Sequence, residues 1–386
     1  MEKEISEKKG FRNIKLLGAS SLFNDVASEM ITPILPFYIQ ALGGTGLAIG
    51  ALSGLREGLS SLFKLLGGWL SDIKGKRKIF VFLGYSISII SRLFIFLAGS
   101  WQAVLGFVSL ERLGKVRDAP RDAIIIDHAK KRGKGFGLHQ MLDTSGAVLG
   151  TILVIFLFWK FSLGFKSIIL IAALISVFSL VPLFFVKDIG YKTEKQSLLR
   201  GVKNLNPKLK YFIFISAIFT MANFGLYMFL VMLAKQVFNS ILISLILYTV
   251  FSLVTALFVT YFGSLSDKIG RKKVLFSGYS LFLILAFLFV FLTNSPPFII
   301  ASFVIYGLVY ALTLSNQKAL ISDLAGEMKG TSLGFFYFVT GLVNIPAGII
   351  AGALWDFSPK TMFIYLSCLA FVSLVLLIFV REKQEI

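Results

Sequence analysis

Long apolar stretches separated by short polar segments run through the whole chain. A bilayer core about 30 Å thick requires roughly 20 apolar residues per helix. On that measure the pattern predicts an all-α membrane protein with twelve membrane-spanning helices. We place them near residues 14–40, 46–70, 79–98, 102–126, 135–158, 164–186, 209–234, 241–264, 274–293, 297–321, 331–354 and 360–380.

Lysines and arginines are concentrated in alternate polar segments. Most lie in the N-terminal tail, the C-terminal tail and the loops 71–78, 127–134, 187–208, 266–273 and 323–330. The opposite loops carry only Lys160, Lys166, Lys235 and Lys360. Because cytoplasmic loops are enriched in cations, this alternation predicts a multi-pass protein of the cell (plasma or inner) membrane with both termini in the cytoplasm.

Composition excludes several classes of protein. With 56% hydrophobic residues and a mean hydropathy of +0.82, the chain is more apolar than soluble proteins, which have about 45–50%. The net charge of +19 is spread over loops between spans, so we expect contact with membrane lipid and no nucleic-acid partner. Cys368 is the single cysteine, which leaves no disulfide and no cysteine cluster for a metal. No phosphate-binding loop of the G-x-x-x-x-G-K-[ST] type is present, so we do not expect ATP-driven pumping by this chain. We expect no cofactor, and the apolar composition argues against an enzyme.

One loop occurs twice. Gly68-Trp-Leu-Ser-Asp72-Ile-Lys-Gly75-Lys76-Arg77 returns as Gly263-Ser-Leu-Ser-Asp267-Lys-Ile-Gly270-Arg271-Lys272, 195 positions later in a chain of 386. A weaker echo links the segments that end in Asp127 and Asp323. The glycines at 75 and 270 can adopt positive φ, so a helix can end there in a sharp turn. We predict a duplication with bundles at 1–186 and 209–386, joined by a polar cytoplasmic linker at 187–208.

The loop resembles the signature Gly-x-x-x-Asp-x-x-Gly-[Lys/Arg]-[Lys/Arg] of the major facilitator superfamily, which likewise recurs between the eighth and ninth spans. Ile73 departs from it where a cation is usual. The resemblance implies two six-helix bundles related by a pseudo-twofold axis and secondary transport by alternating access. It also implies a cytoplasmic gate, to which we assign Gly68, Asp72, Gly75, Lys76, Arg77, Arg121, Asp127, Gly263, Asp267, Gly270, Arg271 and Asp323.

Several charges lie inside predicted spans, where each costs at least about 2.5–3.5 kcal/mol. Asp25 and Glu29 are one helical turn apart, so they share a face and repel each other. A carboxyl in that position can take up and release protons; the alternative is a salt bridge to another helix. At similar depth lie further charges, and we predict a substrate and proton site formed by Asp25, Glu29, Arg56, Glu57, Glu111, Arg112 and Asp143.

Two further features bear on the solute. Gly146 and Gly150 form a G-x-x-x-G pair in the fifth span, which allows helices to approach closely. The second half offers uncharged polar and aromatic stripes instead, with Asn223, Tyr227, Tyr306 and Tyr310 among them. They either line one wall of a cavity for an amphiphilic solute or make ordinary core contacts.

These observations predict a proton-coupled secondary transporter that acts as a monomer on a small solute. The run Asn24-Asp25-x-x-Ser28-Glu29 and the run from Gly114 to Ala123 resemble those of prokaryotic efflux-type facilitators. The resemblance favours export of a drug-like, amphiphilic or metal substrate. Uptake of a small organic anion is the alternative, because the charged spans are rich in cations. A membrane scaffold or sensor without transport remains a third alternative.

Overall fold

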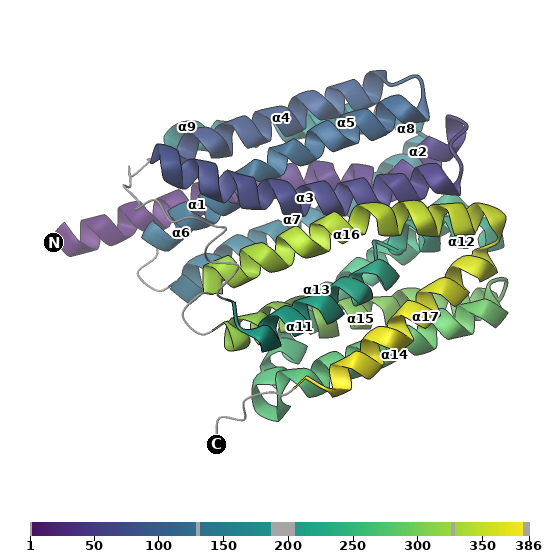
Figure 1. Cartoon of the computed structure of the whole chain (residues 1–386). Helices are drawn as coiled ribbons and strands as arrows, with labels where there is room; N and C mark the ends of the chain where they lie inside the picture. Colours follow the sequence, from purple (N-terminus) through teal and green to yellow (C-terminus); the bar gives the residue numbers. More distant parts are fainter. Residues whose placement is uncertain (1, 129–131, 187–204, 326–328, 381–386) are drawn as a thin grey trace. The chain divides into compact units, whose positions relative to one another are not determined.

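The computed structural model of the chain describes residues 2–128, 132–186, 205–325 and 329–380, except the side chains of 2–11, 72, 126–128, 132–136, 329 and 330 (Figure 1). Every regular element among them is helical, as predicted. In chain order the elements are α1 (Glu2–Ile31), η1 (Thr32–Ile34), α2 (Leu35–Ala41), α3 (Gly46–Lys74), α4 (Arg77–Leu97), α5 (Trp101–Leu113), η2 (Gly114–Arg117), α6 (Asp118–His128), α7 (Arg132–Phe161), α8 (Phe165–Val177), α9 (Val181–Phe185), α11 (Pro207–Ala222), α12 (Tyr227–Phe238), α13 (Ile241–Ile269), α14 (Arg271–Leu292), α15 (Pro296–Leu324), α16 (Lys329–Phe357) and α17 (Pro359–Ile378).

The predicted spans all correspond to helices, but four of them are interrupted. The first contains the 3₁₀ turn η1 at Pro33, and the fourth contains η2. The sixth is divided between α8 and α9, and the seventh between α11 and α12. At the break in the first span, Pro33 lacks a backbone N–H donor. At the break in the seventh span, Gly225 has a φ of 91°, which glycine adopts readily. The sequence therefore provides a local reason for both breaks.

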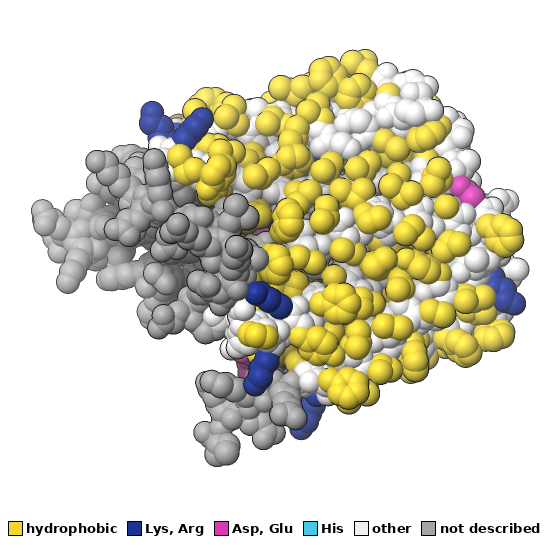
Figure 2. Space-filling model, viewed as in Figure 1, with side chains coloured by type: hydrophobic (Ala, Val, Ile, Leu, Met, Phe, Trp, Pro, Cys, Tyr) yellow, Lys and Arg dark blue, Asp and Glu magenta, His cyan; other side chains and the backbone are white. Residues whose placement is uncertain are grey.

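Within the described ranges, nine helical segments are long and apolar enough to cross a membrane by length and composition. The three predicted spans outside this set are α1 to α2, α3, and α5 to α6. Six of the seven predicted substrate and proton site residues lie on these three spans, and the seventh, Asp143, lies on α7. Large apolar side chains are exposed on the other helices, including Leu257, Phe291 and Trp159, which are 72%, 66% and 65% exposed. Figure 2 shows hydrophobic side chains spread over the described part of one face, with the visible Lys, Arg, Asp and Glu side chains near its ends, as expected of a surface in contact with lipid.

Residue choice explains several helix boundaries. Ser100 and Ser240 accept hydrogen bonds from the backbone N–H of Ala103 and Ile243, both at 3.3 Å, which caps α5 and α13. Gly75 and Gly270 have φ values of 63° and 100°. The predicted sharp turns at both copies of the repeated loop are therefore confirmed.

The two loop copies also form the same contacts. Ser71 Oγ donates to the Gly68 carbonyl at 2.9 Å, and Ser266 Oγ donates to the Gly263 carbonyl at 2.7 Å. Two lysines that stand one position apart in the register of the repeat each reach the end of a later helix. Lys78 Nζ donates to Phe184 O at 3.2 Å, and Lys272 Nζ donates to Ile378 O at 2.6 Å. Cations stabilise helix C-termini, so the repeat extends from sequence to hydrogen bonding.

The chain forms two compact units: residues 1–43 with 59–195, and residues 44–58 with 196–386. We call them unit 1 and unit 2. The first half of α3 therefore belongs to unit 2, a feature that the sequence analysis did not predict. Its glycines recur every four residues at 46, 50, 54 and 58, and a Cβ on Gly50 would lie only 2.1 Å from the Gly348 carbonyl oxygen of α16. Only glycine permits this approach.

A carboxylate fixes the start of α3 in unit 2. The backbone N–H groups of Gly46 and Leu47 donate to Asp356 Oδ1 and Oδ2 at 2.6 and 2.8 Å. The N–H groups of a first helical turn have no partner within the helix, so this side chain satisfies two of them.

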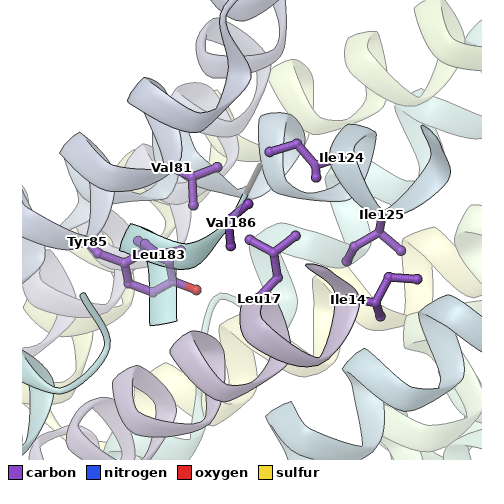
Figure 3. Packing of buried hydrophobic residues seen from close by; sticks show 8 residues of the cluster. All are labelled: Ile14, Leu17, Val81, Tyr85, Ile124, Ile125, Leu183 and Val186. Atoms are coloured by element: carbon purple, nitrogen blue, oxygen red, sulfur yellow. The ribbon is translucent and has the colours of Figure 1, made fainter. Parts of the chain in front are cut away.

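Unit 1 has an apolar core where α1, α4, α6 and α9 meet. The buried members Ile14, Leu17, Val81, Tyr85, Ile124, Ile125, Leu183 and Val186 pack together (Figure 3). Tyr85 is the one polar member and carries its ring from α4 into this core. Its ring also faces Arg117, so the apolar core borders the charged site directly.

Candidate functional site

A chain of hydrogen bonds connects three helices of unit 1. Asn24 Nδ2 on α1 donates to Asp25 Oδ1 at 3.0 Å, and Asn24 Oδ1 accepts from Arg92 Nη2 on α4 at 3.1 Å. The same Arg92 nitrogen lies 3.1 Å from Glu111 Oε1 on α5, and Arg112 pairs with Glu111 Oε2. The side chains of Arg92, Glu111 and Arg112 are only 1%, 7% and 6% exposed. Buried charges persist only when they are paired in this way.

One carboxylate gathers four cations slightly further along the fourth span. Asp118 Oδ2 lies 3.5 Å from Lys64 Nζ and 3.7 Å from Lys115 Nζ, and Asp118 Oδ1 lies 3.8 Å from both Arg117 Nε and Arg121 Nη1. Lys64 comes from α3, so this cluster ties the second half of α3 to the fourth span. One of the four cations, Arg121, also pairs with Asp122 at 3.1 Å.

Arg117 occupies the 3₁₀ turn η2 and is 3% exposed. Its Nη1 donates to Ser88 Oγ at 2.8 Å and to the Gly114 carbonyl at 2.9 Å, and its guanidinium lies 4.4 Å from the Tyr85 ring centre. The turn can pack this closely because a Cβ on Gly84 would meet the Gly114 carbonyl at 2.6 Å. Glycine at 84 therefore permits the contact of α4 with η2.

The α7 helix brings Asp143 to the same region. Cβ atoms on Gly146 and Gly150 would lie 2.6 and 2.4 Å from carbonyl oxygens of α1, so the predicted close approach through this pair is confirmed. His139 Nδ1 lies 3.4 Å from Asp143 Oδ2, one turn away on α7. The charges that act on the Asp25 carboxyl are those of Asp143, Lys115, Arg117 and Arg121. Asp25 and Asp143 thus belong to one electrostatic group.

The predicted site residues divide between the two units. Asp25, Glu29, Glu111, Arg112 and Asp143 lie in unit 1, where Glu29 stands beside Gly150 of α7. Arg56, which is buried, and Glu57 lie in the part of α3 that belongs to unit 2. The expectation that all seven form one centre remains a prediction.

Three of the predicted gate residues form an ion-pair cluster in unit 2. Arg271 Nη1 lies 2.9 Å from Asp267 Oδ1, and Arg271 Nε pairs with Asp323 of α15. In unit 1, Gly68 packs against Ala119, Arg77 is buried, and Arg121 bonds to Asp122 and Ser21. The side chains of Asp72 and Asp127 lie outside the described residues. Lys76 precedes α4 in an extended conformation.

Comparison with known proteins fixes the family. Residues 17–240 and 212–386 match the model of the Major Facilitator Superfamily. The chain belongs to the major facilitator superfamily.

Relatives and solved structures agree with this assignment. An uncharacterized MFS-type transporter of Methanocaldococcus jannaschii, MJ1317, is 45% identical over 379 residues, which cover 96% of this chain and 95% of that protein. The multidrug resistance protein MdtG of Citrobacter koseri is 24% identical over 361 residues, covering 89% and 88%. A crystal structure of a mutant of the nucleoside transporter NupG has a TM-score of 0.81 at 14% identity, covering 96% and 100%. The chain is thus a multi-pass membrane transporter with the facilitator fold.

The sequence analysis of this facilitator overlooked several residues that the structure places in the site. Arg92, Lys64 and Asp118 are not among the residues that it assigned to the substrate and proton site or to the gate. Their importance lies in their partners on other helices, which spacing along one helix does not reveal. A signal was present for the close contact of α3 with α16, which we call the glycine seam, since four glycines at intervals of four residues indicate close packing.

Proposed function

We propose that the chain is a secondary active transporter that exports a drug-like, amphiphilic solute in exchange for protons. The observation that carries the proposal is the hydrogen-bonded chain from Asp25 through Asn24, Arg92 and Glu111 to Arg112 in membrane-spanning helices. Charges in that environment cost stability and are characteristic of proton and substrate pathways. The similarity to MdtG, a multidrug resistance protein, supports the direction.

Protonation of Asp25 would act on the rest of the network. The Asp25 carboxylate accepts a hydrogen bond from the Asn24 side-chain NH2, and the Asn24 side-chain oxygen accepts one from Arg92. Loss of the Asp25 charge would weaken the first link of this chain and leave the nearby cations less balanced. Two conformations that hold this network differently would then differ in proton affinity, which is the coupling that alternating access requires. Glu29 and Asp143 would share the titration as neighbouring acids.

Alternating access would take place between two six-helix bundles, at 1–186 and 209–386, with 187–208 as a cytoplasmic linker. The cluster of Asp267, Arg271 and Asp323, together with the loop from Gly68 to Arg77, would serve as the cytoplasmic gate. Exposed ion pairs of this kind contribute little to stability, so they can form in one conformation and break in another at low cost. Both termini would lie in the cytoplasm, and a single chain would suffice.

Proteoliposomes with the cytoplasmic face outward and an acidic lumen test the proposal. Wild-type protein should accumulate the amphiphilic dye Hoechst 33342 in the lumen and release luminal protons. The double variant Asp25→Asn/Glu29→Gln should lose the coupled proton flux and retain passive exchange of dye. Asp122→Asn, which removes a half-exposed carboxylate of the same unit, is the matched control. Coupling that survives in the double variant would refute the role of these acids.

Uptake of a small organic anion is the second candidate. The supporting observation is the surplus of buried cations in unit 1, where Arg92, Arg112 and Arg117 are all nearly inaccessible. Vesicles of the opposite orientation with an acidic exterior distinguish the two. Accumulation of benzoate there, without any movement of Hoechst 33342, would favour uptake.

A further inference from the structure

Five aromatic rings of unit 2 meet beside the break in the seventh span. We call Tyr227, Tyr248, Phe251, Tyr306 and Tyr310 the aromatic cage; they come from α12, α13 and α15. Phe251 is at its centre, with ring centroids 5.2 Å from Tyr306, 5.3 Å from Tyr310, 5.8 Å from Tyr248 and 6.2 Å from Tyr227. These spacings fall in the range of direct ring contact, so the cage is a single packed group.

Glu57 of α3 adjoins the cage. A Cβ built on Gly225 would lie 3.6 Å from Tyr227 Cε1 and 3.7 Å from Glu57 Cγ, so ring and acid flank the same point of the helix break. The charge of Glu57 also acts on the hydroxyls of Tyr306 and Tyr310. Glu57 and Tyr310 remain half-buried, whereas Tyr306 is fully buried. The accessible edge of the cage therefore carries the carboxylate.

The helix break is held in place by specific contacts. Gly225 has a φ of 91°, which only glycine adopts readily. Ser53 Oγ donates to the carbonyl of Phe224 at 2.8 Å, and Tyr306 OH donates to Asn223 Oδ1 at 2.6 Å. Because Ser53 precedes Glu57 by one helical turn, the contact that fixes the break also orients the acid. The arrangement is preorganised.

This combination of groups selects for one kind of charge. The faces of aromatic rings are negative and attract cations within about 6 Å, with Tyr among the favourable partners. A carboxylate at the edge of the cage adds attraction for a cation and repulsion for an anion. Arg56 is adjacent in sequence but lies about 100° around the helix, and neighbours of that spacing do not face each other.

We propose that Glu57 and the aromatic cage form a binding subsite for a lipophilic organic cation, which would make such cations a substrate class. The second part rests on the proposed transport function. The first does not, because binding at the subsite can be measured without any flux.

Tetraphenylphosphonium and tetraphenylborate are suitable probes because they have nearly the same size and shape and opposite charge. Binding of radiolabelled tetraphenylphosphonium to the full chain in nanodiscs should be saturable, with tetraphenylborate failing to compete. Glu57→Gln should raise the Kd about tenfold or more, and Phe251→Leu should raise it about threefold to thirtyfold. Tyr310→Phe, which keeps the ring, should change it by less than about twofold. Asp122→Asn, which removes a half-exposed carboxylate of unit 1, is the charge control.

The outcomes separate the subsite from the transport proposal. Each variant is first shown to elute as a single species and to unfold cooperatively, and Glu57→Asp provides a milder variant in case Glu57→Gln does not fold. Equal affinity for tetraphenylphosphonium in wild type and Glu57→Gln, or equal competition by the borate, overturns the subsite even if protons and Hoechst 33342 are exchanged. Charge-selective binding that depends on Glu57, with no proton-coupled flux of any solute, upholds the subsite and overturns the transport proposal.

Discussion

Glu111 holds two buried guanidinium groups together, so its neutralisation is the most informative single change in unit 1. Arg92 Nη2 lies 3.1 Å from Glu111 Oε1. At that separation and an effective dielectric constant of about 20, the attraction is about 5 kcal/mol. The net loss in Glu111→Gln is smaller than this attraction, because the variant no longer has to desolvate a buried carboxylate. Breaking one partner of a buried pair costs about 3–5 kcal/mol overall, and we expect a loss of that size for Glu111→Gln.

Thermal unfolding of the purified protein measures this loss. For a unit of about 180 residues, 1 kcal/mol corresponds to roughly 2–4 °C, so Tm should fall by at least about 6 °C. Asp122→Asn is the matched control, because Asp122 also pairs with an arginine at 3.1 Å but is 45% exposed, and its loss should cost less than about 1 kcal/mol.

A second variant tests the cause. Two guanidiniums and one carboxylate give the buried trio a net charge of +1. Glu111→Gln raises it to +2, and Arg92→Gln/Glu111→Gln returns it to +1. The double variant should therefore recover at least half of the lost stability, as removal of whole buried pairs often does. A double variant less stable than Glu111→Gln would refute the electrostatic reasoning.

Two further predictions concern packing and the gate. Gly50→Ala should lower stability by about 1–3 kcal/mol, because its methyl group would meet Gly348; Gly106→Ala, where nothing lies within 4 Å, should be neutral or stabilising in a thermal-shift assay. Asp323→Asn should lower the free energy of unfolding by less than about 1 kcal/mol, because Asp323 is 50% exposed beside Arg271. It should nevertheless alter the rate of dye exchange in vesicles, and an unchanged rate would remove the cluster from the gate.

The helices and turns were predictable because their causes are local. Span length follows from bilayer thickness, and Gly75 and Gly270 mark their own turns through a conformation that other residues avoid. The repeated loop predicted the duplication, and the repeated bonds of Ser71 and Ser266 agree with it. The pair Gly146 and Gly150 was likewise sufficient to predict a close helix contact, since the need for small residues is intrinsic to such contacts.

The site was less predictable because its partners come from different helices. Spacing placed Glu111 and Arg112 at the same depth as Asp25, but nothing in the sequence showed that Arg92 would reach both Asn24 and Glu111. Glu57 is a similar case: the sequence grouped it with Asp25 by depth, but gave no sign that Tyr227 of unit 2 would be its neighbour. Depth along a helix can be read from a sequence, but the identity of the neighbouring helix depends on the whole fold.

The α3 helix unites these observations, because its two halves are held by different kinds of contact. Its first half meets α16 through glycines: backbone lies against backbone at Gly50, and Asp356 accepts the N–H groups of the first turn. Its second half is tied to the fourth span by the ion pair of Lys64 with Asp118. Separation of Gly50 from Gly348 breaks no ion pair, whereas separation of Lys64 from Asp118 would break one. If the transporter alternates access as proposed, the glycine seam is therefore where α3 would part from its neighbour, and Glu57 lies at its end.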